Sequence, residues 1–417
     1  MMNIAIIGTG VSGLGAAHVL QRQHQVTLFE QASWVGGHAH TVDADGQPVD
    51  TGFIVYNESN YPLLSRLFRE LGVETAPTDM SFGMHNPTNG MAYSSRGLSG
   101  LFARPQNALR PRIYRMIREL GRFNRLARAA LAENRHADIT LGEFLDGHGF
   151  SDVLKLDYIV PMSAAIWSAP PGRMLGFPAL TFFRFFNNHG LLSYAPDIPW
   201  RTVVGGSRKY VQVLIKPIAG RVHCNCPVRA VRRLKDAVCL SFADRPDQTF
   251  DRVVIATHAD QALRLLANPS DDERRLLQRF PYQSNRVVLH RDPSVLPPYP
   301  RAWASWTVNM PPAEQLDQPI AMTYDMNRLQ NIPLPERYLV TLNPASSWQS
   351  KATEKIYYQT DYTHPAYDNE SFRVQPELAE LNAQGPAYFC GAYFGYGFHE
   401  DGLRSGVEVA RALGVEW

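Results

Sequence analysis

The sequence predicts an α/β protein in which a dinucleotide-binding domain, assembled from separate segments of the chain, is interleaved with an α+β domain. Three observations support this prediction. A glycine-rich turn joins an apolar strand to a helix within residues 3–20, a second strand, turn and helix occupy residues 388–412, and aromatic residues and prolines are frequent between them. A chain of 417 residues also exceeds the size at which one hydrophobic core stops growing, so two domains are expected.

The composition is that of an ordinary globular protein, with 45% hydrophobic and 19% charged residues. The net charge of +2 gives no global attraction to nucleic acid, which we do not expect as a partner. The cysteines are too few for a disulfide scaffold and lack the spacing of a zinc site, so no metal is expected. No signal peptide opens the sequence, and no apolar run reaches the roughly 18 residues of a spanning helix. We therefore expect a cytoplasmic protein.

The first forty residues predict a β-α-β unit of Rossmann type. The apolar runs Asn3–Ile7 and Val26–Phe29 flank a segment whose apolar residues recur at helical spacing. In this pattern Gly8 permits the turn, Gly10 lets the backbone approach a pyrophosphate, and Gly13 lets the helix and strand pack closely. The residues expected to meet the pyrophosphate at the start of the helix are Gly8, Gly10, Val11, Ser12 and Gly13.

Glu30 follows the second strand, where a carboxylate accepts hydrogen bonds from the ribose hydroxyls of an adenine dinucleotide. Its negative charge would repel a 2'-phosphate, which disfavours NADP. The pair Gly36 and Gly37 comes shortly afterwards and would let another loop approach the same pyrophosphate. An extended FAD needs such a loop and an ordinary NAD site does not, so the second glycine pair predicts FAD.

The run EQASWVGGHAHT, together with later segments, resembles the superfamily of flavin-containing amine oxidases and phytoene desaturases. The resemblance implies a discontinuous FAD-binding domain of the glutathione-reductase type, formed by residues 1–80, 205–280 and 366–417. The substrate-binding domain would then comprise residues 81–204 and 281–365. His38 stands where the superfamily usually has arginine, so the charge expected over the flavin phosphates is smaller or depends on pH.

Later segments of the FAD-binding domain also resemble the superfamily. Val228–Val231 and Val238–Phe242 alternate like a hairpin, and the resemblance places Val228 against the adenine. It places Thr257, after a buried strand, beneath the cofactor. The alternative for both is an ordinary buried strand.

Near the end of the sequence, a strand ends at Gly391 and Gly402 is expected to open a helix. The resemblance brings Gly391 to the flavin phosphates and Leu403 to the pyrimidine edge, where a helix N-terminus favours negative charge on reduced flavin. The superfamily commonly has an acid directly after the first glycine, but Ala392 stands there. Which acid of His399–Asp401 replaces it stays open, and adjacent residues of this kind rarely converge on a metal.

The middle of the chain supplies the predicted substrate domain. Its tryptophans and the run Thr181–Phe186 could line a channel, although most such residues should form a second core. The aromatic and glycine residues that follow Gly391 would wall the reacting pocket. Tyr393 and Tyr396 are the leading candidates for catalytic pocket residues.

Residues 104–135 carry nine arginines and two glutamates, and apolar residues recur among them at helical spacing. The pattern predicts a basic amphipathic helix. Such a helix can lie on an anionic membrane surface, where each basic contact contributes about 1 kcal/mol, and it would then place the protein peripherally on the inner membrane face. The alternative is a helix that covers the substrate domain and turns its arginines to water.

The strings GGHAHTVD, DTGFIVYN, VGGS at 204–207 and GAYFGYGFHEDGLRSG resemble bacterial flavoproteins associated with cyclopropane, methyl-branched and furan fatty-acid synthesis. This resemblance covers nearly the whole chain. It implies FAD-dependent dehydrogenation of a modified fatty-acyl lipid, with hydride passing to flavin N5. It also implies a fatty-acyl methyltransferase as a partner.

Three alternatives stay open. An amine oxidase generally uses a lysine that reaches the flavin through water, and Lys351 and Lys355 are the candidates by position in the sequence. The protein could instead bind FAD and deliver lipid to a methyltransferase without turnover. Redox-neutral isomerisation on reduced flavin would need the same site.

Overall fold

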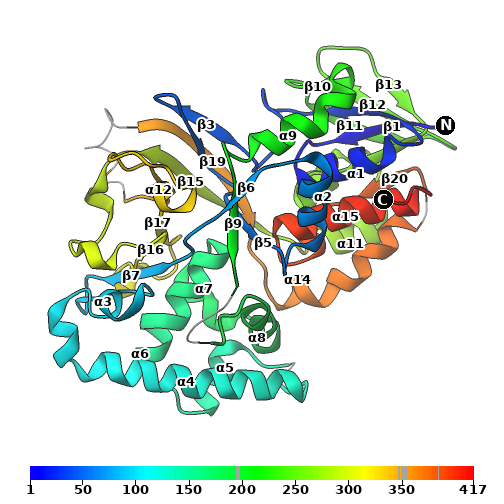
Figure 1. The fold of residues 1–417 in the computed structure, drawn as a ribbon. Helices are drawn as coiled ribbons and strands as arrows, with labels where there is room; N and C mark the ends of the chain where they lie inside the picture. Colours follow the sequence, from blue (N-terminus) through cyan, green and yellow to red (C-terminus); the bar gives the residue numbers. More distant parts are fainter. Residues whose placement is uncertain (137, 194–197, 346–347, 349–355, 384) are drawn as a thin grey trace.

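A computed structural model gives the structure of residues 1–417 except 137, 194–197, 346–347, 349–355 and 384. The chain folds around two large sheets on opposite sides of the molecule (Figure 1). A five-stranded sheet lies on the side that carries both termini, and a seven-stranded sheet lies on the other, with a group of helices beneath it. The predicted α/β fold class is confirmed.

The first sheet is parallel throughout, and its strand order is β10-β2-β1-β14-β20. The three strands β1, β14 and β20 are mostly apolar and buried, as expected for a parallel sheet that is covered on both faces, whereas the edge strand β10 is half-buried. The strands end at one edge of the sheet, where Gly8, Glu30, Ala256 and Gly391 follow within two residues. The strands are β10 (Val222–His223), β2 (Gln25–Phe29), β1 (Asn3–Ile7), β14 (Arg252–Ile255) and β20 (Ala387–Phe389).

The helices α1 (Val11–Leu20) and α15 (His399–Ala412) pack against one another at this sheet. Glycines permit the close approach, since a Cβ added at Gly406 would lie 2.2 Å from the carbonyl oxygen of Ser12. The predicted start of the last helix at Gly402 is wrong, because α15 begins at His399. The carboxylate of Asp401 accepts the backbone amide of Phe398 at 3.1 Å, and this cap fixes the earlier start.

The predicted hairpin is confirmed as the antiparallel pair β11 (Val228–Arg233) and β12 (Val238–Phe242), which β13 (Gln248–Phe250) extends. Shorter elements surround the two sheets. They are β3 (Thr41–Ala44), β4 (Gln47–Asp50), β5 (Val55–Asn57), α2 (Pro62–Leu71), β6 (Thr75–Pro77), β9 (Trp200–Val203), α9 (Arg208–Ile215), α10 (Ala259–Leu265), α11 (Asp271–Leu277) and α14 (Asn369–Val374).

The second sheet has the strand order β19-β15-β18-β17-β16-β7-β8. Neighbouring strands are antiparallel except β16 and β7, which are parallel. The two longest strands, β19 and β15, reach toward the centre of the molecule (Figure 1). The strands are β19 (Ile356–Pro365), β15 (Tyr282–His290), β18 (Leu339–Leu342), β17 (Ala321–Asp325), β16 (Trp306–Asn309), β7 (Phe82–Asn86) and β8 (Met91–Ser94).

The helices beneath this sheet are α3 (Gly97–Leu101), α4 (Pro111–Ala132), α5 (Leu141–Gly147), α6 (Asp152–Leu154), α7 (Val160–Trp167) and α8 (Ala179–Asn188). The predicted basic helix is α4, which starts at Pro111 rather than near Arg104. A proline is well suited to the first position of a helix, and a short 3₁₀ turn (Pro105–Leu109) precedes it. Within the described part of the chain, no helix has both the length and the apolar character needed to cross a membrane.

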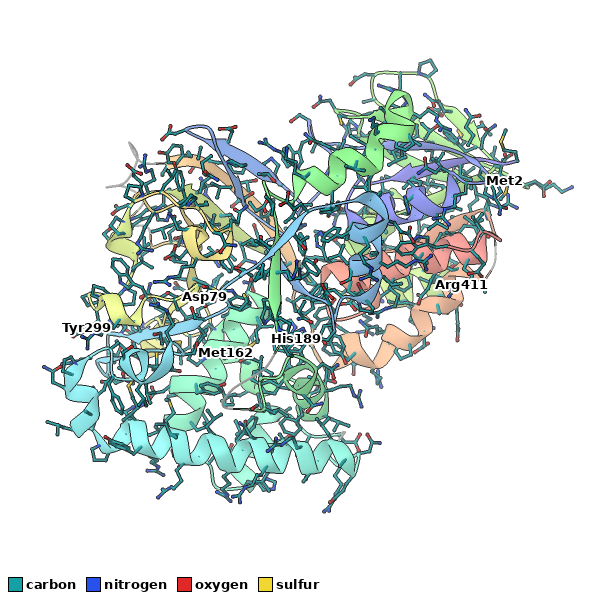
Figure 2. All side chains as sticks on the ribbon, in the orientation of Figure 1. Met2, Asp79, Met162, His189, Tyr299 and Arg411 are labelled. Atoms are coloured by element: carbon teal, nitrogen blue, oxygen red, sulfur yellow. The ribbon has the colours of Figure 1, made fainter. Side chains whose placement is uncertain are left out.

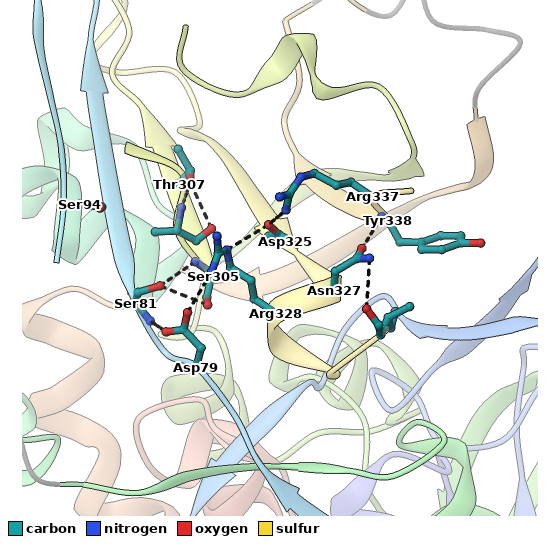
Figure 3. Close-up of polar contacts among 12 residues, drawn as sticks. Asp79, Ser81, Ser94, Ser305, Thr307, Asp325, Asn327, Arg328, Arg337 and Tyr338 are labelled. Atoms are coloured by element: carbon teal, nitrogen blue, oxygen red, sulfur yellow. Dashed lines mark hydrogen bonds and ion pairs between the residues drawn. The ribbon is translucent and has the colours of Figure 1, made fainter. Parts of the chain in front are cut away.

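An ion cluster around the buried Asp325 lies at one end of the second sheet. Asp325, the last residue of β17, pairs with Arg328 at 3.3 Å and with Arg337 (Figure 3). Arg328, in α12 (Met326–Leu329), also lies 3.5 Å from a carboxylate oxygen of Asp79. The cluster therefore links Asp79 to α12 and to the end of β17.

Candidate active site

A cavity of about 970 Å³ is lined by residues of both large sheets. The turns that follow β1, β2 and β14 form one end, and α7, α8 and the second sheet form the other. Met162 and His189, both in its wall, lie near the middle of the molecule in Figure 2. The cavity thus connects the predicted dinucleotide site with the predicted substrate domain.

The glycine turn after β1 leaves open space at the N-terminus of α1. Gly8 has a φ of +101°, and a Cβ there would lie 2.6 Å from the carbonyl oxygen of Ala256. Gly10, by contrast, has no atom within 4 Å of an added Cβ, and no side chain caps the helix at this position. The first amides of a helix lack partners within it, so α1 presents donors to an anion here.

The second glycine pair touches the first turn. Gly37 has a φ of +57°, and a Cβ there would lie 3.0 Å from the Cα atom of Gly10. The amide of Gly36 donates to the carbonyl oxygen of Thr9 at 3.1 Å. Two loops therefore meet at the N-terminus of α1, where the sequence predicts a pyrophosphate.

Glu30 is buried at the end of β2 and is already engaged by its neighbours. Its Oε2 accepts the backbone amide of Thr9 at 2.9 Å and the Thr9 hydroxyl at 2.6 Å, while Oε1 accepts the amide of Ala32 at 2.9 Å. An ionised carboxylate offers about four acceptor positions, so one is left for a ribose hydroxyl. Thr9 was not predicted as a site residue, because it occupies an unrestricted position of the glycine motif.

His38 lies beside this junction in the cavity wall. Its Nε2 is buried and has no hydrogen-bond partner among the described residues. Burial, with smaller contributions from His364, His258 and His399, holds the pKa of His38 well below its ordinary value. His38 is therefore uncharged near neutral pH, unlike the arginine that usually stands at this position in the resembled superfamily.

Three further histidines line the same part of the cavity, and none of them was predicted as a site residue. His258 stacks on Tyr282 with ring centroids 4.3 Å apart. His364 lies 5.4 Å from the ring of His38, and burial lowers its pKa to about 4. Burial likewise lowers the pKa of His399 to about 3. The sequence signal that could have found His258 is its position directly after the predicted strand that ends near Thr257, whereas no predicted strand pointed to His364.

The side chains of His399, Glu400 and Asp401 contact three different parts of the protein. His399 stacks on Phe53 at 3.8 Å, and Glu400 accepts backbone amides at the start of α2. Asp401 accepts the amide of Tyr396 at 3.0 Å. Among the residues that the structure describes, no group of three His, Cys, Asp or Glu side chains is arranged to hold a metal.

The loop after β20 forms the aromatic wall beside the glycine turns. The amide of Gly391 donates to the hydroxyl of Ser405 at 2.9 Å. Tyr393 and Tyr396 both line the cavity, as do Val228 and Thr257. The Tyr393 hydroxyl is buried without a hydrogen-bond partner in the described part of the chain. Four of the predicted cofactor-binding residues do not line the cavity, namely Gly13, Gly36, Gly402 and Leu403. Gly402 instead packs against α1, since a Cβ there would lie 2.8 Å from Oγ of Ser12.

The other end of the cavity is apolar. Of the tryptophans in the predicted substrate domain, Trp167, Trp200 and Trp306 line it, whereas Trp303 lies beneath the guanidinium of Arg337. Most phenylalanines of α8 are core residues, as expected. The apolar lining consists of Met80, Phe82, Met162, Ala165, Ile166, Trp167, Phe185, Leu191, Trp200, Trp306 and Leu329.

The dinucleotide end fits the predicted FAD. It offers an open helix N-terminus at Gly10, a second glycine loop, and a buried carboxylate with one free acceptor position. Lys351 and Lys355 lie outside the described residues. No lysine is among the described residues that line the cavity.

Comparison with known proteins supports a flavin site. The family model described as flavin containing amine oxidoreductase matches residues 11–298. The protein named flavin-containing monoamine oxidase AofH, of Mycobacterium tuberculosis, is 28% identical over 246 residues, which cover 56% of this chain and 52% of AofH. The match therefore spans about half the length of that relative.

One further similarity is in sequence and another is in structure. The 4,4'-diapophytoene desaturase of Staphylococcus aureus is 44% identical over 52 residues, or 12% of this chain and 10% of the desaturase. A solved structure of a putrescine oxidase double mutant matches with a TM-score of 0.72 and 15% identity, over 99% of each chain. At that identity, the structural match shows the shared fold.

Proposed function

The chain belongs to the family of flavin-containing amine oxidoreductases, with FAD as its cofactor, and from this premise we propose that it dehydrogenates a modified fatty-acyl lipid. The lipid would be methyl-branched or related to cyclopropane acids. It would lose a hydride from one carbon to the flavin and a proton from the next carbon to water, which leaves a new double bond. Bound FAD supplies the hydride acceptor, and oxygen or another acceptor reoxidises it.

The chain's own residues would hold the cofactor at the glycine turns. Val11 and Ser12 line the cavity at the start of α1, and their backbone amides would bind the pyrophosphate. Glu30 would use its remaining acceptor position for a ribose hydroxyl. The backbone near Val228 would lie along the adenine, and Thr257 would lie beneath the cofactor, since both line the same end of the cavity.

The observation that carries the substrate proposal is the absence of a free carboxylate at the apolar end of the cavity, among its described residues. The carboxylates in the lining are Glu30 and Asp361. Glu30 lies at the dinucleotide end, and the Asp361 side chain is 56% exposed and pairs with Arg286 at 3.3 Å. A buried ammonium group without a counter-ion would be strongly disfavoured, whereas an acyl chain needs only the apolar wall.

Amine oxidation is the second candidate. The similarity to AofH favours it, and an uncharged amine could enter an aromatic pocket. The similarity to a diapophytoene desaturase, which is named for an apolar substrate, favours the lipid. A third possibility, an FAD-binding partner that delivers lipid to a methyltransferase, uses the same cavity without turnover.

We also propose that the protein meets anionic membrane at one corner, formed by residues 96–118. This corner exposes large apolar side chains, because Leu98 is 74% exposed and Leu109 is 87% exposed. Exposed arginines lie among them, including Arg118, which has no ion-pair or hydrogen-bond partner among the described residues. The corner lies beside Tyr299, labelled at the edge of Figure 2. Apolar anchors within a basic surface suit an anionic lipid headgroup layer.

The test of the substrate is anaerobic mixing of the FAD-loaded protein with vesicles of methyl-branched phospholipid or with a polyamine. We expect the lipid to bleach the visible flavin band and the polyamine to leave it unchanged. Bleaching by the polyamine alone would overturn the lipid proposal. No bleaching by either, together with tight binding to a fatty-acyl methyltransferase, would favour the delivery role.

A variant in the apolar end sharpens this test. Ile166→Trp should narrow the cavity and slow lipid bleaching by about tenfold or more, with FAD content unchanged, because Ile166 lines the cavity. Val213→Trp is the matched control, since Val213 is 40% exposed on α9. Equal slowing by both variants would show that the apolar end does not hold the substrate.

A further inference from the structure

His364 lies in the cavity wall near the end of β19. Its Nδ1 is 2.9 Å from Nδ2 of Asn285, a fully buried residue of the neighbouring strand β15. A neutral histidine ring can donate or accept at Nδ1, so this pair alone does not fix the position of its proton. The hydrogen-bond partners of Asn285, namely Asn343 and Gln283, fix the position of the proton on His364.

The direction of the hydrogen bonds is set by a backbone amide. The N–H of Arg286 donates to Oδ1 of Asn343 at 3.0 Å, and a backbone N–H can only donate. Nδ2 of Asn343 is therefore its donor end. It donates to the carbonyl oxygen of Ile320 at 3.2 Å and to Oδ1 of Asn285 at 2.8 Å.

A second neighbour orients Asn285 in the same way. Nε2 of Gln283 donates to the carbonyl oxygen of Ser168 at 3.1 Å and also lies 3.4 Å from Oδ1 of Asn285. Nδ2 of Asn285 lies 3.4 Å from the carbonyl oxygen of Gln283, which can only accept. The amide of Asn285 thus has its oxygen toward Asn343 and its NH₂ group toward His364.

Nδ1 of His364 must then accept. The neutral ring consequently carries its proton on Nε2, on the side of the ring away from Asn285. Protonation of Nδ1 would set one N–H against another. Burial, followed by the neighbouring His258, also lowers the pKa of His364 to about 4, so the neutral ring is the form present near neutral pH.

We infer that Asn285 is a positioning residue that presents the Nε2–H of His364 to the reaction pocket as a fixed hydrogen-bond donor. This inference rests on the proposed function in one respect, namely that reaction occurs in this cavity. A fixed donor stabilises an atom that gains negative charge during a reaction. His364 in this form cannot take the substrate proton at Nε2, because that nitrogen already carries a proton.

The first test needs no substrate. In protein labelled with ¹⁵N at histidine, long-range ¹H–¹⁵N correlation spectra distinguish the protonated from the bare ring nitrogen, and loss of signals in His364→Gln assigns His364. We expect a bare Nδ1 and a protonated Nε2 at neutral pH, both with and without FAD. A protonated Nδ1 in the unmodified protein would overturn the inference.

His85 provides an internal control, because its Nδ1 faces an amide oxygen and not an amide NH₂ group. Nδ1 of His85 lies 3.1 Å from Oδ1 of Asn309, whose Nδ2 donates to the carbonyl oxygen of Val295 at 2.8 Å. Neither residue lines the cavity. His85 should therefore show a protonated Nδ1 in the same spectrum in which His364 shows a bare one. The same tautomer at both histidines would contradict the argument from amide direction.

Substitution of the positioning residue should invert the ring. In Asn285→Asp a carboxylate faces Nδ1, so we expect a protonated Nδ1 at His364 and no change at His85. The matched change Asn309→Asp should leave both tautomers as they are. If Asn285→Asp folds and His364 keeps a bare Nδ1, Asn285 does not set the tautomer.

The role of the donor is tested on the FAD-loaded protein. His364→Gln can restore an N–H at this place, whereas His364→Leu cannot. We expect the Leu variant to shift the visible absorption maximum and the reduction potential of bound FAD, and the Gln variant to lie nearer the unmodified protein. Equal spectra and potentials in all three would refute a donor role toward the pocket. Neither readout depends on which substrate is correct, so a failed lipid assay would leave this inference standing.

Discussion

The carboxylate of Glu400 accepts a hydrogen bond from the backbone amide of Leu63 at 2.9 Å, although these residues are 337 positions apart. The amide of Leu64 donates to the same carboxylate at 3.0 Å. Both amides belong to the first turn of α2, where Tyr61 provides no side-chain cap. An acid of α15 therefore caps α2 from outside, which ties the last helix to a segment of the first eighty residues.

Glu400→Gln should destabilise the protein by about 1–3 kcal/mol, because an NH₂ group would replace one of two buried acceptors. Urea denaturation at neutral pH measures the change. Glu408→Gln, an exposed position on the same helix, should change the free energy of unfolding by less than about 0.5 kcal/mol. Equal effects of the two substitutions would rule out the capping role.

Gly10→Ala should leave folding intact and reduce FAD occupancy. A Cβ at Gly10 meets no protein atom within 4 Å, so the space it would fill is the space proposed for the pyrophosphate. Absorbance of the purified protein gives the flavin content, and circular dichroism gives the fold. Gly147→Ala, also without a neighbour within 4 Å, is the control and should keep full occupancy. Full occupancy in Gly10→Ala would place the pyrophosphate elsewhere.

The stability of the protein should depend on pH through Asp50. Burial raises its pKa to about 6, although Thr41 and Ser207 donate hydrogen bonds to it. The unfolded chain releases this proton near pH 4, so the folded state binds it more tightly. The contribution of Asp50 is greatest below about pH 4 and falls by up to about 3 kcal/mol as the pH rises through about 6.

Urea denaturation between about pH 4 and 7 measures this effect, and the Asp50→Asn variant should show a flatter dependence than the unmodified protein. Asp244→Asn, at an exposed position, should not alter the slope. A slope unchanged by Asp50→Asn would mean that Asp50 titrates alike in the folded and unfolded chain.

Replacing Leu98 and Leu109 by serine should weaken sedimentation with vesicles that contain an anionic phospholipid, because both side chains are exposed at the proposed membrane corner. Removal of Arg115, Arg118 and Arg122 should weaken it further and reduce its dependence on salt. Val213→Ser and Leu234→Ser, exposed positions on other elements, are the controls. Sedimentation that is unaffected by all these changes would leave α4 as a helix that faces water.

The dinucleotide half of the fold was predictable because its signals are local. The turn from Gly8 to Gly13 and the hairpin from Val228 require only neighbouring residues to be read together. The start of α15 was predicted at the wrong residue although its cap is local, since the prediction followed Gly402 and overlooked Asp401, which accepts the amide of Phe398 three positions earlier. The Asn285–His364 pair spans 79 positions and depends on the pairing of β15 with β19. No spacing within either strand indicates that pairing.

The pocket could be predicted only in outline, for a related physical reason. An aromatic residue in a second core and one in a cavity wall have the same composition and periodicity. Trp303 and Trp306 are three positions apart, yet Trp306 lines the cavity and Trp303 does not. The packing of the whole domain decides between them.

The close packing of α1 against α15 has a consequence for biosynthesis. During translation β1 and α1 are made long before α15, so the surface that Gly15 presents is covered only when residues 399–412 have been made. Until then the nascent chain exposes an apolar helix and an incomplete parallel sheet, which are features that promote aggregation. We therefore expect the nascent protein to need a holding chaperone, and flavin loading to wait until α15 has been made and packed against α1.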